Sequence, residues 1–225
     1  MQHDVLIIGG GLVGAATAYY LARSGASVHL VEKGDINAQA SGQNAGSLHF
    51  QLEHRLIEHG DAQSEQFAQI IPLNLLAIEH WRQLEAELEA DLEVVLHGGL
   101  MVAESEADLA LLKKKYALEK QWGLPTELLS GDEVRAHAPY LTKKIIAAGY
   151  CEAEGHANPR LVTPAFIRAA VRHGAKVSIG TEVKEITRDG DGWCVSLKQA
   201  GQILQVKAGK ILNAAGAWSG DIGRM

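Results

Sequence analysis

The sequence predicts an α/β fold in which a small α+β module is inserted into a domain built on a βαβ unit. Three observations predict this fold. An apolar run at 4–8, a glycine-rich turn and a helical stretch lead to a second apolar run at 27–31. The middle of the chain, 61–151, changes to helical periodicity with short strands. Residues 176–213 then return to strands joined by glycine turns.

Three glycines in the first turn have separate physical roles. Gly9 permits the tight turn after the first strand, and Gly11 lets the backbone approach a pyrophosphate closely. Gly14 lets the following helix lie close on the strand. The start of that helix presents free N–H groups and a partial positive charge to phosphates. Strand, glycines and helix in this order are typical of a Rossmann-like dinucleotide-binding unit.

The second strand ends in an acidic residue, Glu32. Its carboxylate can accept hydrogen bonds from both hydroxyls of an adenosine ribose, and it would repel a 2′-phosphate. The sequence therefore disfavours NADP as the ligand. On the βαβ unit alone, NAD and FAD remain equally compatible with the pattern.

A loop of small and amide side chains follows at 40–49. Its backbone can run flush against a flat ligand because nothing bulky stands in the way. A flexible surface loop is the alternative that the composition leaves open.

The inserted module begins at 61–90, where apolar residues recur at helical spacing and predict one long helix that Pro72 would kink near its start. Lys113, Lys114 and Lys115 lie in a second, charged helix and are expected to form a solvated face. The other elements expected are a strand at 92–103 broken at Gly98 and Gly99, the charged helix at 106–122, a short helix capped at Ser130 and ending at Pro139, and a strand at 144–151.

The last part of the chain is predicted to begin with a helix at Asn158 and Pro159, which Gly174 ends. A final strand at 210–213 runs into the small residues 214–219, which puts unhindered backbone at the carboxyl end of a parallel sheet. A helix entry would have the same pattern. Between these elements, strands are predicted at 176–179, 182–188, 193–198 and 203–206.

The composition is that of an ordinary globular chain, because 47% of the 225 residues are hydrophobic and 21% are charged. The net charge is -6 and the sequence has no cluster of basic residues of the kind that binds nucleic acid, so nucleic-acid binding is not expected. No apolar run is long enough for a transmembrane helix. Peripheral membrane association stays open.

The cysteines and histidines give no metal-ligand spacing, so no metal site is expected. Cys151 and Cys194 stand alone in strand-like segments. Free thiols in a reducing cytoplasm are the expectation, and a disulfide is the minor alternative.

Together these motifs resemble the FAD-dependent oxidoreductases of the D-amino-acid oxidase type, a family that includes glycine oxidase, sarcosine oxidase and D-amino-acid dehydrogenases. The resemblance covers the chain from end to end. The closing run at 213–219, in company with the first glycine motif, favours FAD over NAD. The resemblance rests on 9–14 with Glu32 and Lys33, on 41–48, on Gly155 with Pro159, on Val183 and on 213–219.

The resemblance also implies where FAD would bind. Leu12 and Val13 are expected to bind the pyrophosphate, and Glu32 and Lys33 the ribose and adenine end. Ala40 and Ser41 are expected at the phosphate region, and residues 45–48 along the ribityl chain and the edge of the flavin ring. The backbone of Val183 is expected to pair with the adenine, and residues 214–218 are expected to pack near the pyrophosphate. The full set of expected cofactor-binding residues is Gly9, Gly11, Leu12, Val13, Gly14, Glu32, Lys33, Ala40, Ser41, Asn44, Ala45, Gly46, Ser47, Leu48, Val183, Ala214, Gly216 and Trp218.

The reaction implied is oxidation of the C–N bond of an amino acid or related small amine. Hydride passes to flavin N5, and the imine product is hydrolysed to an oxo acid and ammonia or amine. No acid or base is required if the amine arrives neutral, so no catalytic residue is assigned. His49 follows the flavin loop and would either face the substrate or be structural. The form of the loop at 44–46 looks more like the dehydrogenases of the family than like glycine oxidase.

Members of the family continue well past the closing run, with more substrate sheet, a carboxylate-binding arginine and a glycine-rich segment over the flavin. The resemblance therefore implies a discontinuous FAD-binding domain at 1–83 and 157–225 and a partial substrate (cap) domain at 84–156, incomplete at the C-terminus. The alternatives to an active oxidoreductase are a truncated, non-catalytic fragment and one half of a split flavoenzyme whose second chain supplies the missing elements. An NAD-linked dehydrogenase is a third, less favoured interpretation.

Overall fold

The structure, a computed structural model, describes residues 2–58 and 61–225 of the chain. The chain divides into two compact units. The first unit comprises Met1–Gly46, Leu88–Leu92 and Asn158–Met225, and the second comprises Ser47–Glu87 and Glu93–Ala157. The first unit joins parallel strands to helices, which confirms the predicted α/β class.

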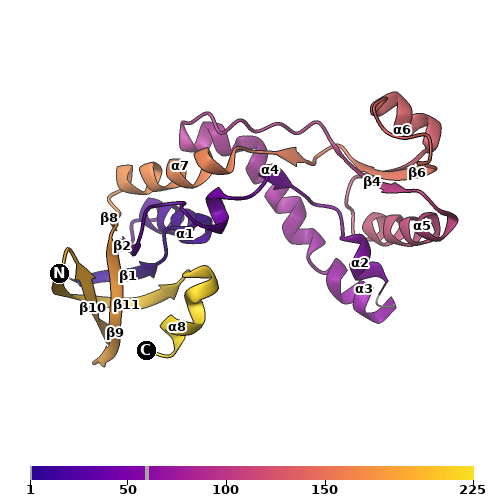
Figure 1. Ribbon diagram of the computed structural model, residues 1–225. Coiled ribbons are helices and arrows are strands. Elements are labelled where there is room, and N and C mark those ends of the chain that lie inside the picture. Colours follow the sequence, from indigo (N-terminus) through magenta and orange to yellow (C-terminus); the bar gives the residue numbers. More distant parts are fainter. Residues whose placement is uncertain (1, 59–60) are drawn as a thin grey trace. The chain divides into compact units, whose positions relative to one another are not determined.

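The first unit contains one six-stranded mixed sheet, built from the two ends of the chain. Its strands are β1 (Gln2–Ile8), β2 (Val28–Val31), β8 (Lys176–Ser178), β9 (Thr181–Asp189), β10 (Gly192–Gln199) and β11 (Gln202–Asn213). They are arranged in the order β8-β2-β1-β11-β10-β9 (Figure 1). The first four strands of that order run parallel, and β11, β10 and β9 form an antiparallel meander.

Helices α1 (Leu12–Arg23) and α7 (Pro159–Arg172) lie side by side along the parallel part of the sheet (Figure 1). The side chain of Asn158 caps α7 by accepting a hydrogen bond from the Arg160 N–H at 2.9 Å. Gly174, with a φ of +91°, follows the end of the helix. The predicted helix start and stop are therefore confirmed.

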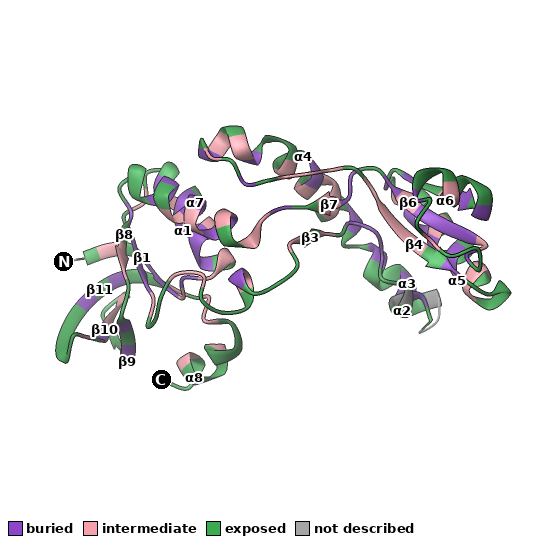
Figure 2. Ribbon diagram, turned by 45° about the horizontal axis from the view of Figure 1, so that its top comes forward, coloured by how far each residue is buried: buried purple, intermediate pink, exposed green. Residues whose placement is uncertain are grey.

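The core of the sheet joins the parallel strands to the meander. Leu6 and Ile8 of β1 are buried with Val183 of β9 and with Val195 and Leu197 of β10. The last three residues of β1, Leu6–Ile8, are buried (Figure 2). This packing fixes the carboxyl ends of the parallel strands, which is where a Rossmann-like sheet binds its ligand.

Strand β11 is longer than the sequence predicted. Its first half pairs with β10, and residues from Lys207 onward pair in parallel with β1. The predicted strands at 203–206 and 210–213 are thus one strand. Gly209 interrupts the apolar pattern, but the pairing with β1 continues on both sides of it, at Ala208 and Lys210. A Cβ at position 209 would lie 3.2 Å from the Asp4 carbonyl oxygen, so a side chain there would be tightly placed.

The second unit has a three-stranded antiparallel sheet in the order β4-β6-β5 and a two-stranded pair, β3-β7. Its strands are β3 (Ser47–Leu48), β4 (Gly99–Ala103), β5 (Thr126–Ser130), β6 (Ala147–Cys151) and β7 (Gly155–His156). Its helices are α2 (His54–Ile57), α3 (Asp61–Ala68), α4 (Ile71–Leu88), α5 (Glu106–Gln121) and α6 (Gly131–His137).

Most elements predicted for the module are present, with two corrections. The long helix expected at 61–90 is two helices, α3 and α4, because Pro72 lies in the first turn of α4, where its missing N–H costs nothing. The strands β3, β5 and β7 were not predicted. β3 and β7 have only two residues each, too few to show periodicity. Ser105 and Ser130 both form capping boxes, at the starts of α5 and α6.

The expectation of a solvated lysine face at 113–115 is wrong for Lys115. Its side chain is fully buried, while Lys113 and Lys114 are exposed. Lys115 forms an ion pair with Glu119 at 2.7 Å and donates to Gln51 Oε1 at 2.8 Å. The charge is buried because both partners lie on the inner side of the unit, one of them 64 residues away in sequence.

The compact units are bounded differently from the predicted domains. Residues 47–83 were expected in the domain formed by the chain ends, and the structure groups them with the second unit. The reason is the shared core of Phe50, Ile71 and Ile78 with Leu118 of α5. Within the described ranges, 2–58 and 61–225, no helix is long and apolar enough to cross a membrane.

We expect the stability of the first unit to fall as the pH is lowered, because of His29. Burial, then the nearby Lys176 ammonium, then His3 lower the pKa of His29 from 6.5 to about 4. Below pH 6.5 the unfolded chain binds a proton that the folded chain does not, so stability is present above that pH and is lost as the pH falls toward 4. Between pH 7 and pH 5 the loss is about 2 kcal/mol.

Urea unfolding of the wild type and of His29→Gln at both pH values measures this effect. The variant should lose much less stability than the wild type on going to pH 5. An equal loss in both proteins would show that another group carries the pH dependence.

Candidate cofactor site

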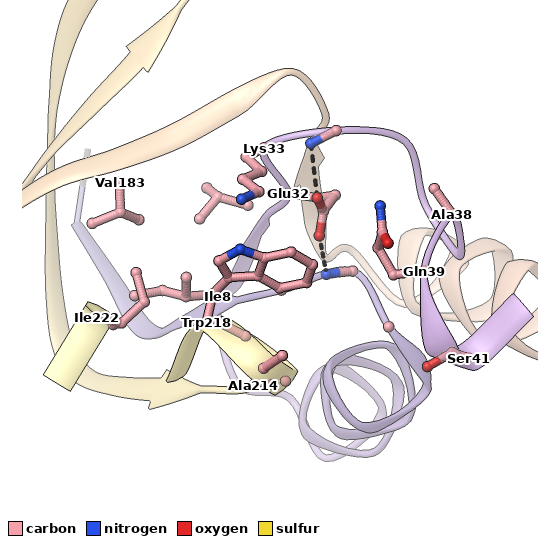
Figure 3. A pocket seen from close by; sticks show the side chains of 18 of the residues that line it. Ile8, Glu32, Lys33, Ala38, Gln39, Ser41, Val183, Ala214, Trp218 and Ile222 are labelled. Carbon is pink, nitrogen blue, oxygen red and sulfur yellow. Dashed lines mark hydrogen bonds between the residues drawn. The ribbon is translucent and has the colours of Figure 1, made fainter. Parts of the chain in front are cut away.

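A cleft of about 530 Å³ opens at the carboxyl ends of β1 and β2 in the first unit. This volume lies in the range of small-molecule and cofactor pockets. The walls come from the glycine turn after β1, the end of β2 with the loop to Ser41, the start of β9, and the segment after β11 (Figure 3). Segments far apart in the sequence therefore share one concave surface.

The glycine turn leaves bare backbone on the cleft wall. Gly9 has a φ of +115°, and a Cβ there would lie 2.3 Å from the Ala214 carbonyl oxygen. A Cβ on Gly14 would lie 2.0 Å from the Gly9 carbonyl oxygen. A Cβ on Gly11 would approach Ser41 Oγ to 3.0 Å. These contacts confirm the tight turn and the close helix packing that the glycine spacing predicts.

Glu32 is held in place at the end of β2 by two backbone donors. Its Oε2 accepts the Gly10 N–H at 2.8 Å, and its Oε1 accepts the Gly34 N–H at 2.7 Å (Figure 3). A carboxylate offers about four lone-pair positions, so two further donors can still be accepted. The arrangement suits a vicinal pair of hydroxyls arriving from the cleft.

The N-terminus of α1 forms the wall next to the glycine turn. Ser41 Oγ accepts the Leu12 N–H at 3.0 Å, which ties the loop after β2 to the helix start. Leu12 and Val13 both line the cleft. The first-turn N–H groups and the helix dipole favour an anion at this end of the helix.

The segment after β11 closes the other side of the cleft. The Ala214 N–H donates to the Ile8 carbonyl at 2.9 Å, which holds the segment beside the glycine turn. The Lys33 Nζ lies 4.3 Å from the centroid of the Trp218 ring, within cation–π range. Figure 3 shows the Trp218 ring reaching into the cleft toward Glu32.

A second carboxylate on the cleft wall already has a cationic partner. The hydrogen bond from Lys184 lowers the pKa of Glu182, which lines the cleft at the start of β9, and the two side chains form an ion pair at 2.7 Å. Glu32, whose partners are neutral backbone N–H groups, is therefore the carboxylate that disfavours an extra phosphate.

The structure brings most of the predicted site residues together and leaves some outside the cleft. Gly14 lies behind the turn against Gly9. Those lining the cleft are Gly9, Gly11, Leu12, Val13, Glu32, Lys33, Ala40, Ser41, Val183, Ala214, Gly216 and Trp218. Those that do not line it are Asn44, Ala45, Gly46, Ser47 and Leu48.

The loop at 44–48 has a structure of its own. The Asn44 amide donates to the carbonyls of Ala40 and Ser41 and accepts the Gly46 N–H, which shapes the turn. Ser47 and Leu48 form β3 and pair with β7 in the second unit. A cofactor role for this loop stays a prediction.

Sequence reasoning missed several residues of the cleft, among them Asn37, Gln39 and Thr181. Asn37 has a φ of +65°, and its amide donates to the Pro159 carbonyl at 2.8 Å. Asparagine tolerates this backbone conformation, so the residue is a usable signal for a tight turn after the second strand. Thr181 gives no signal, because only the tertiary fold brings it to the cleft.

The fold and the cleft define a dinucleotide-binding protein of the Rossmann type, with bare backbone for a pyrophosphate and a fixed carboxylate for a ribose. The chain belongs to the DAO family of FAD-dependent oxidoreductases, whose family model matches residues 4–225. Membership confirms the predicted resemblance, and FAD is the cofactor of the family.

Curated relatives and solved structures agree with this assignment. The chain is 30% identical to the anaerobic glycerol-3-phosphate dehydrogenase subunit A1 of Haloferax volcanii, covering 98% of this chain and 37% of that protein. It is 28% identical to the glycine oxidase of Bacillus subtilis, covering 97% and 55%. The crystal structure of glycine oxidase from Geobacillus kaustophilus matches with a TM-score of 0.84 at 27% identity, covering 99% and 58%. The chain thus spans about half the length of these relatives or less.

Proposed function

We propose that this chain binds FAD in the cleft of the first unit. The observation that carries the proposal is the glycine turn beside the fixed Glu32 carboxylate, in which Gly9 and Gly11 line the cleft and Gly14 packs behind them. Bare backbone at the turn would let a pyrophosphate approach the α1 N-terminus, and the carboxylate would accept ribose hydroxyls. The residues of this chain fit the cofactor of the family.

Each wall of the cleft has a proposed task. The backbone N–H groups of Leu12 and Val13 would bind the pyrophosphate, with the Leu12 N–H turning to it from Ser41 Oγ, and Glu32 would accept the ribose hydroxyls. Val183 would offer its backbone to the adenine, and Ala214, Gly216 and Trp218 would pack near the pyrophosphate. Ser47 and Leu48 keep the role that the family resemblance gives them, at the ribityl chain and ring edge.

We further propose that the chain is part of an enzyme that oxidises the C–N bond of an amino acid or a related amine. When bound, the flavin supplies a hydride acceptor, N5, for the C–H bond beside the amine nitrogen, and water then hydrolyses the imine. Glycine oxidase and N-methyl-L-tryptophan oxidase among the relatives support this substrate class. The FAD-binding role belongs to the first unit and a partial substrate role to the second.

The remaining parts of the substrate site would come from polypeptide outside this sequence, and a second chain is one source. A non-catalytic, flavin-binding fragment is the alternative. We propose the reducing cytoplasm as the location of the protein, because Cys151 and Cys194 are free thiols.

The visible spectrum of the purified chain tests the proposal. We expect flavin absorption close to one FAD per chain, released as FAD rather than FMN on denaturation. A colourless protein that takes up no added FAD would refute FAD binding.

Anaerobic bleaching of the bound flavin then tests the substrate class. Glycine, N-methyl-L-tryptophan and L-proline should be compared with glycerol 3-phosphate, the substrate named for the archaeal relative. Reduction by an amine supports C–N oxidation, and reduction by glycerol 3-phosphate alone contradicts it. Bound flavin that none of the four reduces would favour the non-catalytic or split alternative.

A further inference from the structure

A network of buried polar side chains lies in the second unit and takes no part in the cleft. Lys115 and Glu119 of α5 form an ion pair at 2.7 Å, and each side chain is 1% exposed. Lys115 Nζ also donates to Gln51 Oε1 at 2.8 Å. Gln51 Nε2 donates in turn to Glu154 Oε2 at 2.9 Å. We call these four side chains the buried network.

The buried network holds one extended segment by its backbone. Glu154 Oε1 accepts the N–H groups of Phe50 and Gln51, both at 2.7 Å. Glu119 Oε1 accepts the Leu52 N–H, also at 2.7 Å. Three consecutive backbone donors thus end on two carboxylates, and hydrogen bonds to ionised acceptors are the stronger class.

Neighbouring glycines leave room for the network. A Cβ on Gly99 would lie 2.1 Å from Glu154 Oε2. A Cβ on Gly149 would lie 3.1 Å from Gln51 Oε1 and 3.6 Å from Lys115 Nζ. Strands β4 and β6 therefore each carry a glycine where a side chain of the network lies against the strand.

Stability does not account for such a network. Burying two carboxylates and an ammonium costs their hydration, and replacing a buried ion pair by apolar groups is often neutral or stabilising. Lysine and glutamate are almost never fully buried unless paired. What the network provides is a single geometry for the segment, because the backbone N–H groups of Phe50, Gln51 and Leu52 each have a carboxylate acceptor at a fixed position.

The segment held in this way continues directly from β3. His49 lies between Leu48 and the anchored Phe50, with its Nδ1 3.9 Å from Glu154 Oε2. β3 itself is short and pairs with β7 through only two residue positions. The anchoring of 50–52 is thus the stronger constraint on where Ser47 and Leu48 lie.

We propose that the buried network is a positioning device for Ser47, Leu48 and His49, with Gln51, Lys115, Glu119 and Glu154 as positioning residues. The inference rests on the proposed function in one step, which is the assignment of Ser47 and Leu48 to the flavin. On that assignment, displacing the segment would change the surroundings of the flavin ring.

Glu154→Gln is the variant that tests the device with least change in shape. The partners of the Glu154 carboxylate are the N–H groups of Phe50 and Gln51 and the Gln51 amide, all of them donors. A glutamine amide would therefore turn an NH₂ group toward a donor in either orientation. Glu152→Gln is the matched control, because Glu152 is exposed two residues away.

Hydrogen exchange of the peptide that spans 50–52 is the first readout, and it needs no flavin. Loss of a hydrogen bond to a charged acceptor should speed exchange of the Phe50 and Gln51 amides by about tenfold or more in Glu154→Gln. Glu152→Gln should exchange like the wild type. Equal protection in all three proteins would overturn the anchoring.

The midpoint potential of the bound flavin is the second readout, measured by equilibration with a reference dye. We expect a shift in Glu154→Gln that Glu152→Gln does not reproduce, with FAD content unchanged. Faster exchange with an unshifted potential would overturn the positioning role. A wild-type chain that holds no flavin would refute the proposed function instead, while the exchange data would still decide the anchoring.

A second variant covers the case in which Glu154→Gln does not fold. Lys115→Met with Glu119→Gln removes both charges, keeps the side-chain volumes and leaves an acceptor for the Leu52 N–H. Its control is Lys113→Met, since Lys113 is exposed on the same helix. The same two readouts apply, with the same outcomes for and against.

Discussion

Gly14→Ala is expected to lose about 100-fold in FAD affinity and about 2–3 kcal/mol in the free energy of unfolding. The new Cβ would lie 2.0 Å from the Gly9 carbonyl oxygen, 3.2 Å from its carbon and 3.4 Å from Ile7 Cγ2. The first two atoms are backbone and cannot rotate away. Helix α1 must therefore move off β1, and the N–H groups of Leu12 and Val13 lose their aim at the pyrophosphate together.

Calorimetric titration of the apoprotein with FAD and urea unfolding measure the two effects. Gly223→Ala is the control, because a Cβ there meets nothing within 4 Å and the backbone conformation is ordinary. Unchanged FAD affinity in Gly14→Ala would show that the helix start does not bind the pyrophosphate.

Glu32→Ala is expected to weaken FAD binding by about 1–3 kcal/mol, which is roughly 5- to 150-fold. The substitution removes the acceptor for the ribose hydroxyls. It also leaves the N–H groups of Gly10 and Gly34 without the carboxylate that now holds them. Both losses act on the same end of the cofactor, so riboflavin and FMN should be insensitive to the change.

Equilibrium dialysis against FAD, ADP and FMN measures the selectivity of this loss. The control is Glu185→Ala, an exposed carboxylate of β9 outside the cleft. The ribose assignment is wrong if Glu32→Ala retains FAD and ADP as well as Glu185→Ala does.

The residues of the cleft wall that the sequence predicted depend on local chemistry. Gly9 and Gly14 are needed because a backbone atom occupies the space of their side chains, and such needs appear as glycine at fixed spacing. Glu32 can be predicted in the same way, since it directly follows the strand that comes after a recognisable helix. Each of these signals lies within about 30 residues of the others.

The parts that sequence reasoning missed depend on distant partners. Lys115 stands in a run of three lysines, and only Gln51, far away in sequence, makes its burial possible. Thr181 joins the cleft because the meander folds back on the parallel strands. The grouping of 47–83 with the second compact unit has the same kind of cause, because Phe50, Ile71 and Ile78 share a core with Leu118 of α5. Hydrophobic periodicity indicates which face of a helix or strand is buried, but it does not indicate which other element covers that face.

A structure of the chain with FAD bound is the decisive measurement for the proposed cofactor site. We expect the ribose hydroxyls within hydrogen-bond distance of Glu32, the pyrophosphate at the N–H groups of Leu12 and Val13, and the adenine at the backbone of Val183. An adenosine bound anywhere else, with the glycine turn left facing solvent, would contradict it.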